Sequence, residues 1–293
     1  MKRIVSVFLF VTMISTSLIA QDDLMDLFEE EEKVDYTTAT FKTTRLALGY
    51  SVENPAKNDL NFIISHHFGK INTGAYEFFG LDQATIRLGF EYGITDRFTV
   101  GYGRSSYNKT YDGYLKYKIL RQSKGLQKMP LTMSFLAATS INSLKWEEPD
   151  QENYFSSRMT YLFQIIMARK INKNLSLQVM PSLVHKNLVA TTDDKNDIVT
   201  MGIGGRYKFT KRTSINVEYH YVVPNQINSY DYTNSLTIGF DIETGGHVFQ
   251  LFFTNSVPIN VTDFLTQTTD KWENGGIFFG FNIARTFSFG NKK

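Results

Sequence analysis

Hydrophobic and polar residues alternate one by one along much of the chain, and the segment from Asp197 to Val223 shows this most clearly. It consists of two alternating runs, DIVTMGIGGRYKFT and TSINVEYHYVV, which are separated by Lys211 and Arg212. A period of two residues is typical of β-strands with one apolar and one polar face. Apolar aromatic residues opposite glycine and charged residues suit a wall between lipid and a wet interior. The segment therefore predicts a hairpin in a membrane β-barrel.

The same alternation recurs from residue 43 to residue 289 and predicts thirteen strands in total. Most of them have roughly the 9–11 residues that a tilted strand needs to cross a bilayer. Strands of a soluble β-sandwich are more often shorter. The pattern therefore predicts an all-β, antiparallel transmembrane barrel. The predicted strands are 43–51, 58–68, 85–92, 98–106, 111–120, 131–141, 158–167, 175–183, 197–210, 213–223, 236–243, 247–255 and 276–289.

The segments between these strands alternate between short and long. The short ones are 94–97, 170–174, 210–212 and 243–246, and the long ones are 105–111, 143–155, 188–196, 225–232 and 257–275. Bacterial outer-membrane barrels have short turns on the periplasmic side and longer loops on the outer side. The short set is therefore predicted to face the periplasm, where the chain also ends after Phe287 and Phe289.

The strand count carries a further prediction, because single-chain bacterial barrels have an even number of strands. Following the alternation of loops backwards, residues 58–68 run outward, so a wall strand at 43–51 would have to enter from outside. An exported N-terminus begins in the periplasm. We therefore predict a twelve-stranded barrel domain over residues 58–290, with 43–57 off the wall and available as a partial plug in the lumen. A fourteen-stranded barrel with one unrecognised strand is the alternative.

The first 42 residues differ from the rest of the chain. Residues 1–20 are predicted to be a signal peptide, since Lys2 and Arg3 precede an apolar run at 4–14 that is too short to span a membrane. Residues 21–42 form an acidic periplasmic tail. Within it, 21–33 is either a solvated segment or a short amphipathic segment that docks a periplasmic protein.

Composition narrows the classes of function. The formal net charge of +2 gives no footprint for nucleic acid. The absence of cysteine excludes disulfides, thiolate sites and a lipid anchor on cysteine. A negative mean hydropathy argues against transmembrane helices, but the polar interior of a barrel lowers this average as well. The expected surroundings are therefore outer-membrane lipid in a Gram-negative cell, with the oligomeric state left open.

Charged residues of both signs occupy the predicted inward positions. In one interpretation they pair across strands and close a small barrel, since unpaired buried charge is costly. In the other they form a charged constriction that selects small polar solutes. Asp241 and Glu243 are candidates for a role beyond the wall, paired with Arg206 or Lys208. The predicted lumen-lining residues are Arg87, Glu91, Lys116, Lys118, Arg158, Arg206, Lys208, Glu218, His220, Asp241 and Glu243.

The sequence gives little support for a metal site, a catalytic site or a bound cofactor. The five histidines include the adjacent pair His66 and His67, whose side chains point to opposite faces of a strand, so no metal site is predicted. No histidine is placed beside a serine near the outer loops, so no catalytic residue and no enzyme activity are predicted. The glycines at 202–205 precede no helix and therefore do not indicate a dinucleotide cofactor. Gly245 and Gly246 are expected to supply positive φ in a tight turn.

Several segments resemble a known family. They are ISHHFG (64–69), GLDQATIRLGFEYGITDR (80–97), GRSSYNKTYDGYLKY (103–117), LQVMPSLVHKN (177–187), GIGGRYKFTKR (202–212) and GFDIETGGHVFQLFFTNS (239–256). Together they are similar to an uncharacterised β-barrel family of Bacteroidota outer membranes, catalogued as a domain of unknown function. The resemblance covers nearly the whole mature chain and implies an outer-membrane barrel without an established activity. At His67 the chain departs from the family, in which arginine is more usual.

Two functions follow as main hypotheses, beside a membrane hydrolase that would use a serine of the outer rim. The first is a passive pore or transporter for small polar solutes. The alternative is a closed structural barrel that docks a periplasmic or surface partner. Whether the lumen is open, and whether residues 43–51 fill it, distinguishes the two.

Overall fold

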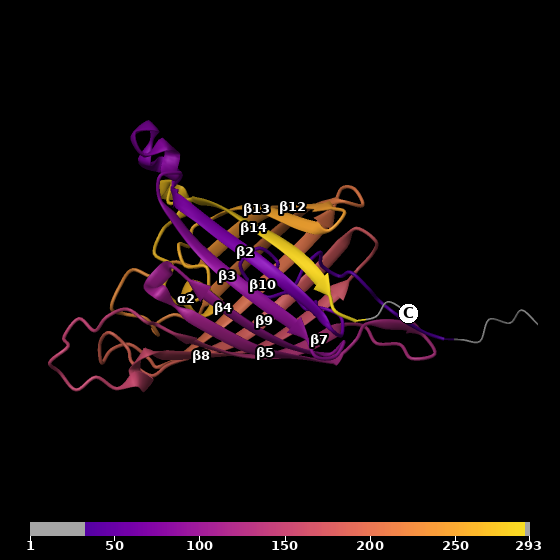
Figure 1. Cartoon of the computed structure of the whole chain (residues 1–293), viewed down its shortest axis with the longest axis horizontal. Coiled ribbons are helices and arrows are strands. Elements are labelled where there is room, and N and C mark those ends of the chain that lie inside the picture. Colours follow the sequence, from indigo (N-terminus) through magenta and orange to yellow (C-terminus); the bar gives the residue numbers. More distant parts are fainter. Residues whose placement is uncertain (1–32, 291–293) are drawn as a thin grey trace, which may run out of the picture.

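A computed structural model describes residues 33–290 of the chain (Figure 1). The predicted signal peptide and residues 21–32 of the predicted acidic tail lie outside the described residues. Within the described part, no helix combines the length and the hydrophobicity that crossing a bilayer requires.

Twelve antiparallel strands form a closed barrel in this part of the chain. Each strand pairs with the next one in sequence, and the last pairs with the first, so the twelve-strand prediction is confirmed and the fourteen-strand alternative is wrong. The wall consists of β2 (Asp59–Lys70), β3 (Ala84–Gly93), β4 (Phe98–Ser105), β5 (Tyr111–Leu120), β7 (Thr132–Ile141), β8 (Met159–Lys170), β9 (Leu175–Lys186), β10 (Asp197–Lys208), β11 (Thr213–Val222), β12 (Ser235–Thr244), β13 (His247–Thr254) and β14 (Phe278–Ser288).

Side chains of the wall alternate between the outer surface and the interior, as the hydrophobic pattern predicts. On β10, Ile203 is 52% exposed, whereas Arg206 is 1% exposed. The hairpin of β10 and β11 pairs Gly205 with Val217, and it reverses direction after Lys208 pairs with Ser214. The apolar side chains therefore form the outer band of the barrel.

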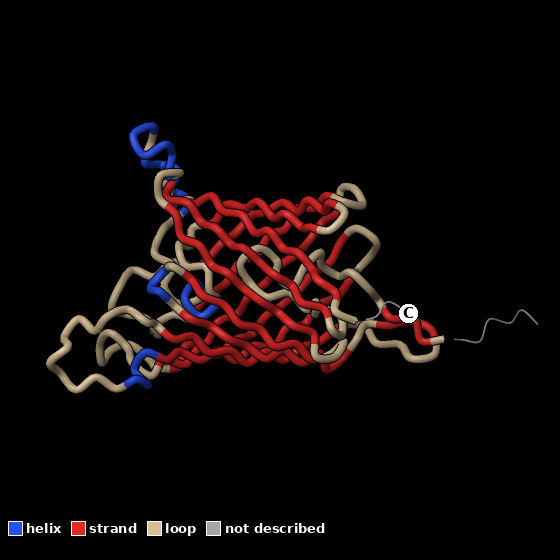
Figure 2. The backbone as a smooth tube through the Cα atoms, viewed as in Figure 1, coloured by secondary structure: helices blue, strands red, loops and turns tan. Residues whose placement is uncertain are grey.

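The two ends of the barrel differ, as Figure 2 shows. One end, here called the short-turn end, carries the turns 94–97, 171–174, 209–212 and 245–246. The opposite, long-loop end carries the short helices η1 (Ile71–Thr73), η2 (Ala75–Gly80), η3 (Tyr107–Lys109), η4 (Phe155–Arg158), α2 (Val261–Phe264) and η5 (Trp272–Asn274).

The turn at Gly245 and Gly246 corrects one prediction, because neither glycine is among the residues with positive φ. Instead, the Gly246 amide donates a hydrogen bond to the Thr244 carbonyl oxygen at 2.5 Å. This bond spans two residues, as in a γ-turn, whose common form has a negative φ. The turn therefore does not require the left-handed conformation of glycine.

A second, two-stranded sheet lies outside the wall. Strand β1 (Val34–Tyr36) pairs with β6 (Ser123–Gly125), which belongs to the connection between β5 and β7. The Tyr36 ring stacks on the Arg121 guanidinium at 4.0 Å. Figure 1 shows this sheet near the C-terminus, beyond the wall at the short-turn end. Residues 34–36 thus form a strand within the segment predicted as a tail.

From β1 the chain turns into the barrel. Residues 40–52 are buried except for the half-buried Lys42, and they reverse direction in a tight turn in which the Leu46 amide bonds to the Gly49 carbonyl at 2.9 Å. Figure 2 shows this part as a loop inside the wall. As predicted, residues 43–51 form no strand of the wall and lie in the lumen. We call residues 37–57 the N-terminal segment.

The loop between β13 and β14 fills the long-loop half of the interior. Its residues Val261, Phe264 and Leu265 are buried, and they join one apolar cluster with Leu46 and Leu48 of the N-terminal segment. Inward side chains of the wall complete this cluster, among them Leu136, Leu162, Ile166, Met180, Val184 and Phe252. The interior is therefore a packed core with polar parts, and not the uniformly polar lumen that alternation alone suggests.

Candidate functional site

The candidate site is the contact between the N-terminal segment and the wall that surrounds it. Glu218 of β11 accepts hydrogen bonds from the backbone amides of Leu48 at 2.5 Å and Gly49 at 3.0 Å. Both amides sit in the tight turn of the segment, where no strand partner satisfies them. The buried carboxylate thus takes the place of a neighbouring strand.

Neutral side chains make the same kind of contact. The Gln178 carboxamide accepts from the Val52 amide at 2.9 Å and donates to the Tyr50 carbonyl oxygen at 2.8 Å. The carboxamides of Gln250 and Asn282 donate to carbonyl oxygens of residues 46 and 47, each at 2.7 Å. The wall therefore binds the backbone of the segment from several directions.

Basic side chains of the wall bind the two ends of the segment. The Lys116 ammonium, which is fully buried, donates to the Ser51 carbonyl oxygen at 3.2 Å. The Arg206 guanidinium donates to the Ala39 carbonyl oxygen at 2.8 Å. Backbone oxygens thus offset part of the cost of burying these two charges.

Ion pairs link the segment to the wall, and one further ion pair stays within the wall. Arg45 approaches Glu91 of β3 at 3.7 Å, and its guanidinium lies 4.0 Å from the centre of the Tyr50 ring. Arg87 instead forms a two-point pair with Asp112 of β5, at 2.8 and 2.5 Å. Charged side chains of the wall therefore have two uses: some pair with each other across strands, and others bind the segment.

Two of the sequence-predicted residues have other partners than expected. Asp241 accepts from Ser214, Asn216 and Gln250 at 3.0, 2.6 and 2.9 Å, and Glu243 pairs with Lys42 of the segment. The predicted pairing of these carboxylates with Arg206 or Lys208 is therefore wrong. The register places neutral donors beside Asp241, while the N-terminal segment brings its own cation to Glu243.

Arg158 also differs from its prediction as a lumen residue. It ends η4 at the long-loop end, and its guanidinium stacks over the Trp146 ring at 3.6 Å. Lys208 is half-buried at the short-turn end of β10. Lys118, at the corresponding end of β5, is likewise half-buried.

His220 lies where the N-terminal segment meets the β13–β14 loop inside the lumen. Its Nε2 atom is 3.4 Å from the Glu218 carboxylate, and its ring is 5.0 Å from that of Phe264 on α2. Its Nδ1 atom has no hydrogen-bond partner among the described residues. No group of three or more metal-ligating side chains occurs in residues 33–290.

The side-chain carboxamides that bind the segment are not among the residues predicted from the sequence. Gln178, Gln250 and Asn282 occupy inward positions of their strands, and that position is the signal that could have identified them. The candidates predicted from the sequence all carry a formal charge or an imidazole, and carboxamides have neither. An extended backbone requires both donors and acceptors, and a carboxamide supplies both in one side chain.

Comparison with known proteins adds the family. Residues 41–287 match a family model described as "Membrane bound beta barrel domain (DUF5777)". The chain belongs to this family. The resemblance to an outer-membrane barrel family of unknown function is thereby confirmed, and its Bacteroidota origin stays an expectation. No curated protein is similar enough in sequence to count as a relative.

Solved structures with a similar fold are outer-membrane barrels. The DUF5777 barrel is similar to the NanC porin, with a TM-score of 0.49 and 9% identity over 78% of this chain and 100% of the porin. An outer membrane channel from Pseudomonas putida F1 gives 0.48 and 12% over 84% and 100%. Outer membrane phospholipase A from Escherichia coli, in an active-site mutant, gives 0.45 and 10% over 80% and 91%. The DUF5777 barrel is membrane-bound, and its apolar outer band contacts lipid.

Proposed function

We propose that this barrel is a gated pore for small polar solutes and that the N-terminal segment is the gate. The observation that carries the proposal is the way the segment fills the lumen. It belongs to no strand of the wall, and wall side chains, not a strand ladder, bind its backbone. It can therefore leave without breaking the barrel.

The chemistry of this contact supports a segment that leaves. A permanently filled interior is built at lower cost from apolar residues, because buried charges lose hydration. Here Lys116, Arg206 and Glu218 are nearly fully buried against backbone groups of the segment. When the segment withdraws, water hydrates the same side chains, and the wall becomes the charged constriction of a pore.

The path of withdrawal leads to the short-turn end, where the segment enters. Its anchors there include the three-residue ladder of β1 with β6, the stacking of Tyr36 on Arg121, a 2.8 Å bond from the Thr37 amide to the Gln122 carbonyl, and the ion pair of Lys42 with Glu243. A ladder of this length is weak by itself. On the predicted topology, this end faces the periplasm.

A closed docking barrel is the second candidate, and one observation favours it. The β13–β14 loop is buried at the long-loop end, and Phe264 contacts the same apolar cluster as the N-terminal segment. If that loop does not move, withdrawal of the segment opens only half of the lumen. The barrel would then serve as a scaffold for a partner.

A disulfide lock tests the gate. A Cβ atom placed at Gly239 of β12 lies 3.6 Å from the Cβ of Ala47, within the range of natural disulfides. The chain has no native cysteine, so the Ala47→Cys/Gly239→Cys pair is specific. In planar bilayers we expect the oxidised pair to stay silent and the reduced pair to match the wild type. A variant without residues 37–57 should conduct continuously.

Two controls complete the experiment. Each single-cysteine variant should conduct like the wild type under oxidising conditions. Altered mobility of unheated samples on gels establishes that every variant forms the barrel. If the deletion variant folds and remains silent, the gated pore is excluded and the docking barrel stands.

A further inference from the structure

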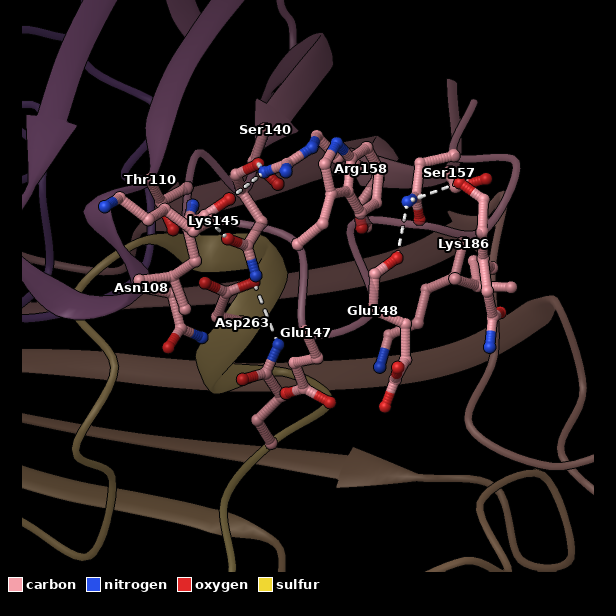
Figure 3. A pocket seen from close by; sticks show the side chains of 18 residues that line it. Asn108, Thr110, Ser140, Lys145, Glu147, Glu148, Ser157, Arg158, Lys186 and Asp263 are labelled. Atoms are coloured by element: carbon pink, nitrogen blue, oxygen red, sulfur yellow. Dashed lines mark hydrogen bonds between the residues drawn. The ribbon is translucent and has the colours of Figure 1, made fainter. Parts of the chain in front are cut away.

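A cavity of about 500 Å³ lies at the long-loop end, apart from the contact between wall and N-terminal segment (Figure 3). The loop between β7 and β8 forms one side, and α2 with the residues that follow it forms the other. The volume is within the range of small-molecule sites. The N-terminal segment does not line this cavity, and of the predicted lumen charges only Arg158 does.

The β7–β8 side of the cavity is held in place by Arg158. Its guanidinium stacks on Trp146, donates to the Asn142 carbonyl oxygen at 2.9 Å, and also bonds to the Leu144 carbonyl oxygen. These three contacts fix the backbone of the loop and one face of the indole. Arg158 is therefore a positioning residue for Trp146.

Strained backbone borders the same cavity. Asn108, which lines it, has a φ of 49°, and the next residue, Lys109, has a φ of 46°. Left-handed conformations of residues other than glycine persist where the surroundings enforce them, and they gather at binding sites. The Ser143 hydroxyl donates to the Lys109 carbonyl oxygen at 2.6 Å and ties this strained turn to the β7–β8 loop.

Buried polar groups form the floor. Asp263 is 6% exposed and Thr110 is 2% exposed, and both line the cavity. The Asp263 carboxylate accepts from the Gln267 carboxamide at 3.2 Å. The Thr110 hydroxyl has no hydrogen-bond partner among the described residues. A buried hydroxyl without a partner is costly, and a ligand in the cavity satisfies it.

The lining as a whole suits an uncharged, hydroxyl-rich molecule. It contains three basic and three acidic side chains, so its formal charge is zero, together with five carboxamides and one indole. Carboxamides donate and accept hydrogen bonds, as sugar hydroxyls do. The indole offers an apolar surface for the C–H face of a pyranose ring. We propose that this cavity binds a short, uncharged oligosaccharide.

The proposal goes beyond the gated pore and does not depend on it. Binding at this cavity requires no opening of the lumen, and the readout of binding is separate from conductance. Asp263 and Gln267 belong to the β13–β14 loop, so a bound saccharide contacts the element that fills the long-loop half of the interior.

Tryptophan fluorescence tests the site directly. The chain has two tryptophans, and Trp272 lies outside the cavity, where its indole donates to the Leu236 carbonyl oxygen at 3.0 Å. A Trp272→Phe variant therefore reports on Trp146 alone. In detergent, we expect a saturable emission change with at least one of maltotriose, xylotriose and chitotriose. The matched Trp146→Phe variant should show none.

Two further variants locate the ligand. Gln267→Ala in the Trp272→Phe background should weaken binding roughly five- to tenfold, as expected for one lost hydrogen bond. Arg158→Lys keeps the charge but loses the planar stack, so it should shift the unliganded emission and weaken binding as well. The proposal is overturned if no trisaccharide changes the emission of Trp146. An equal or larger response to tri-alanine would assign the cavity to peptides and overturn it too.

Discussion

Two elements fill the interior of this barrel, and they are held in different ways. The N-terminal segment is bound through its backbone, by polar side chains such as Glu218 and Gln178 that replace a neighbouring strand. The β13–β14 loop satisfies its own backbone in and around α2 and presents Val261, Phe264 and Leu265 to the apolar cluster. Both contacts bury apolar side chains, since Leu46 and Leu48 of the segment lie in the same cluster, but the first adds hydrogen bonds from the wall that water can replace at modest cost. The two elements therefore differ in what satisfies their backbone groups, which are side chains of the wall for the segment and the loop's own turns for the loop.

The largest expected effect on stability comes from a change in the β13–β14 loop. Phe264 is fully buried, so Phe264→Ala should lower the free energy of unfolding by about 3–5 kcal/mol. Urea titration of the barrel in lipid or detergent, followed by fluorescence, measures the loss. Phe79→Ala, at a side chain that is 55% exposed on η2, is the matched control and should change little. A loss below 1 kcal/mol would mean that the loop is not part of the core.

The second effect concerns the retention of the N-terminal segment in the lumen. Glu218→Ala leaves the Leu48 and Gly49 amides without their acceptor, which should weaken retention of the segment by about 2–3 kcal/mol. Faster hydrogen exchange at these two amides measures it. Glu218→Gln keeps one acceptor oxygen and should lie between the wild type and the alanine variant. If exchange at these amides is unchanged in the alanine variant, Glu218 does not hold the segment.

The smallest effect is a pH dependence at Asp263, in a loop outside the spanning strands. Burial raises the pKa of this carboxyl to about 6, above its usual 3.8. Because the charged form is disfavoured in the folded state, the cost to stability is complete above about pH 6 and absent below about pH 4. Asp263→Asn should therefore stabilise the barrel by on the order of 1–2 kcal/mol at pH 8 and not at pH 3.5. Unfolding titrations at both pH values provide the test, and an equal gain at both would refute it.

The wall could be predicted because every residue in it contributes to a pattern of period two. Ile203 outside and Arg206 inside follow from the alternation, and the position of residues 43–51 in the lumen follows from the even number of strands. Both predictions rest on rules that do not depend on which side chains meet. The location of the chain in a membrane could be predicted from the same alternation, because it places apolar side chains on the outside of the barrel.

The partners inside the lumen could not be predicted, because they depend on register and on the path of the N-terminal segment. Asp241 has carboxamides as neighbours, and Lys42 reaches Glu243 only because the segment passes that side of the wall. The sheet of β1 and β6 is three residues long, too short for a period to be recognised. The cavity at the long-loop end is lined by residues from loops and strands between Asn108 and Gln267, and no local sequence pattern indicates that these residues lie together.

The seam of the barrel has a consequence for assembly. It joins β14 to β2, so that Ser288 lies opposite Asp59, the two ends of the wall in sequence. Contacts between residues so distant along a chain form late, because the intervening polypeptide must be ordered first. Until the seam closes, the sheet is an open surface on which β9 and β11 are already accessible to residues 48–52. We therefore expect the contacts of residues 48–52 with β9 and β11 to form before the seam closes, so that the final pairing encloses them without threading of the chain.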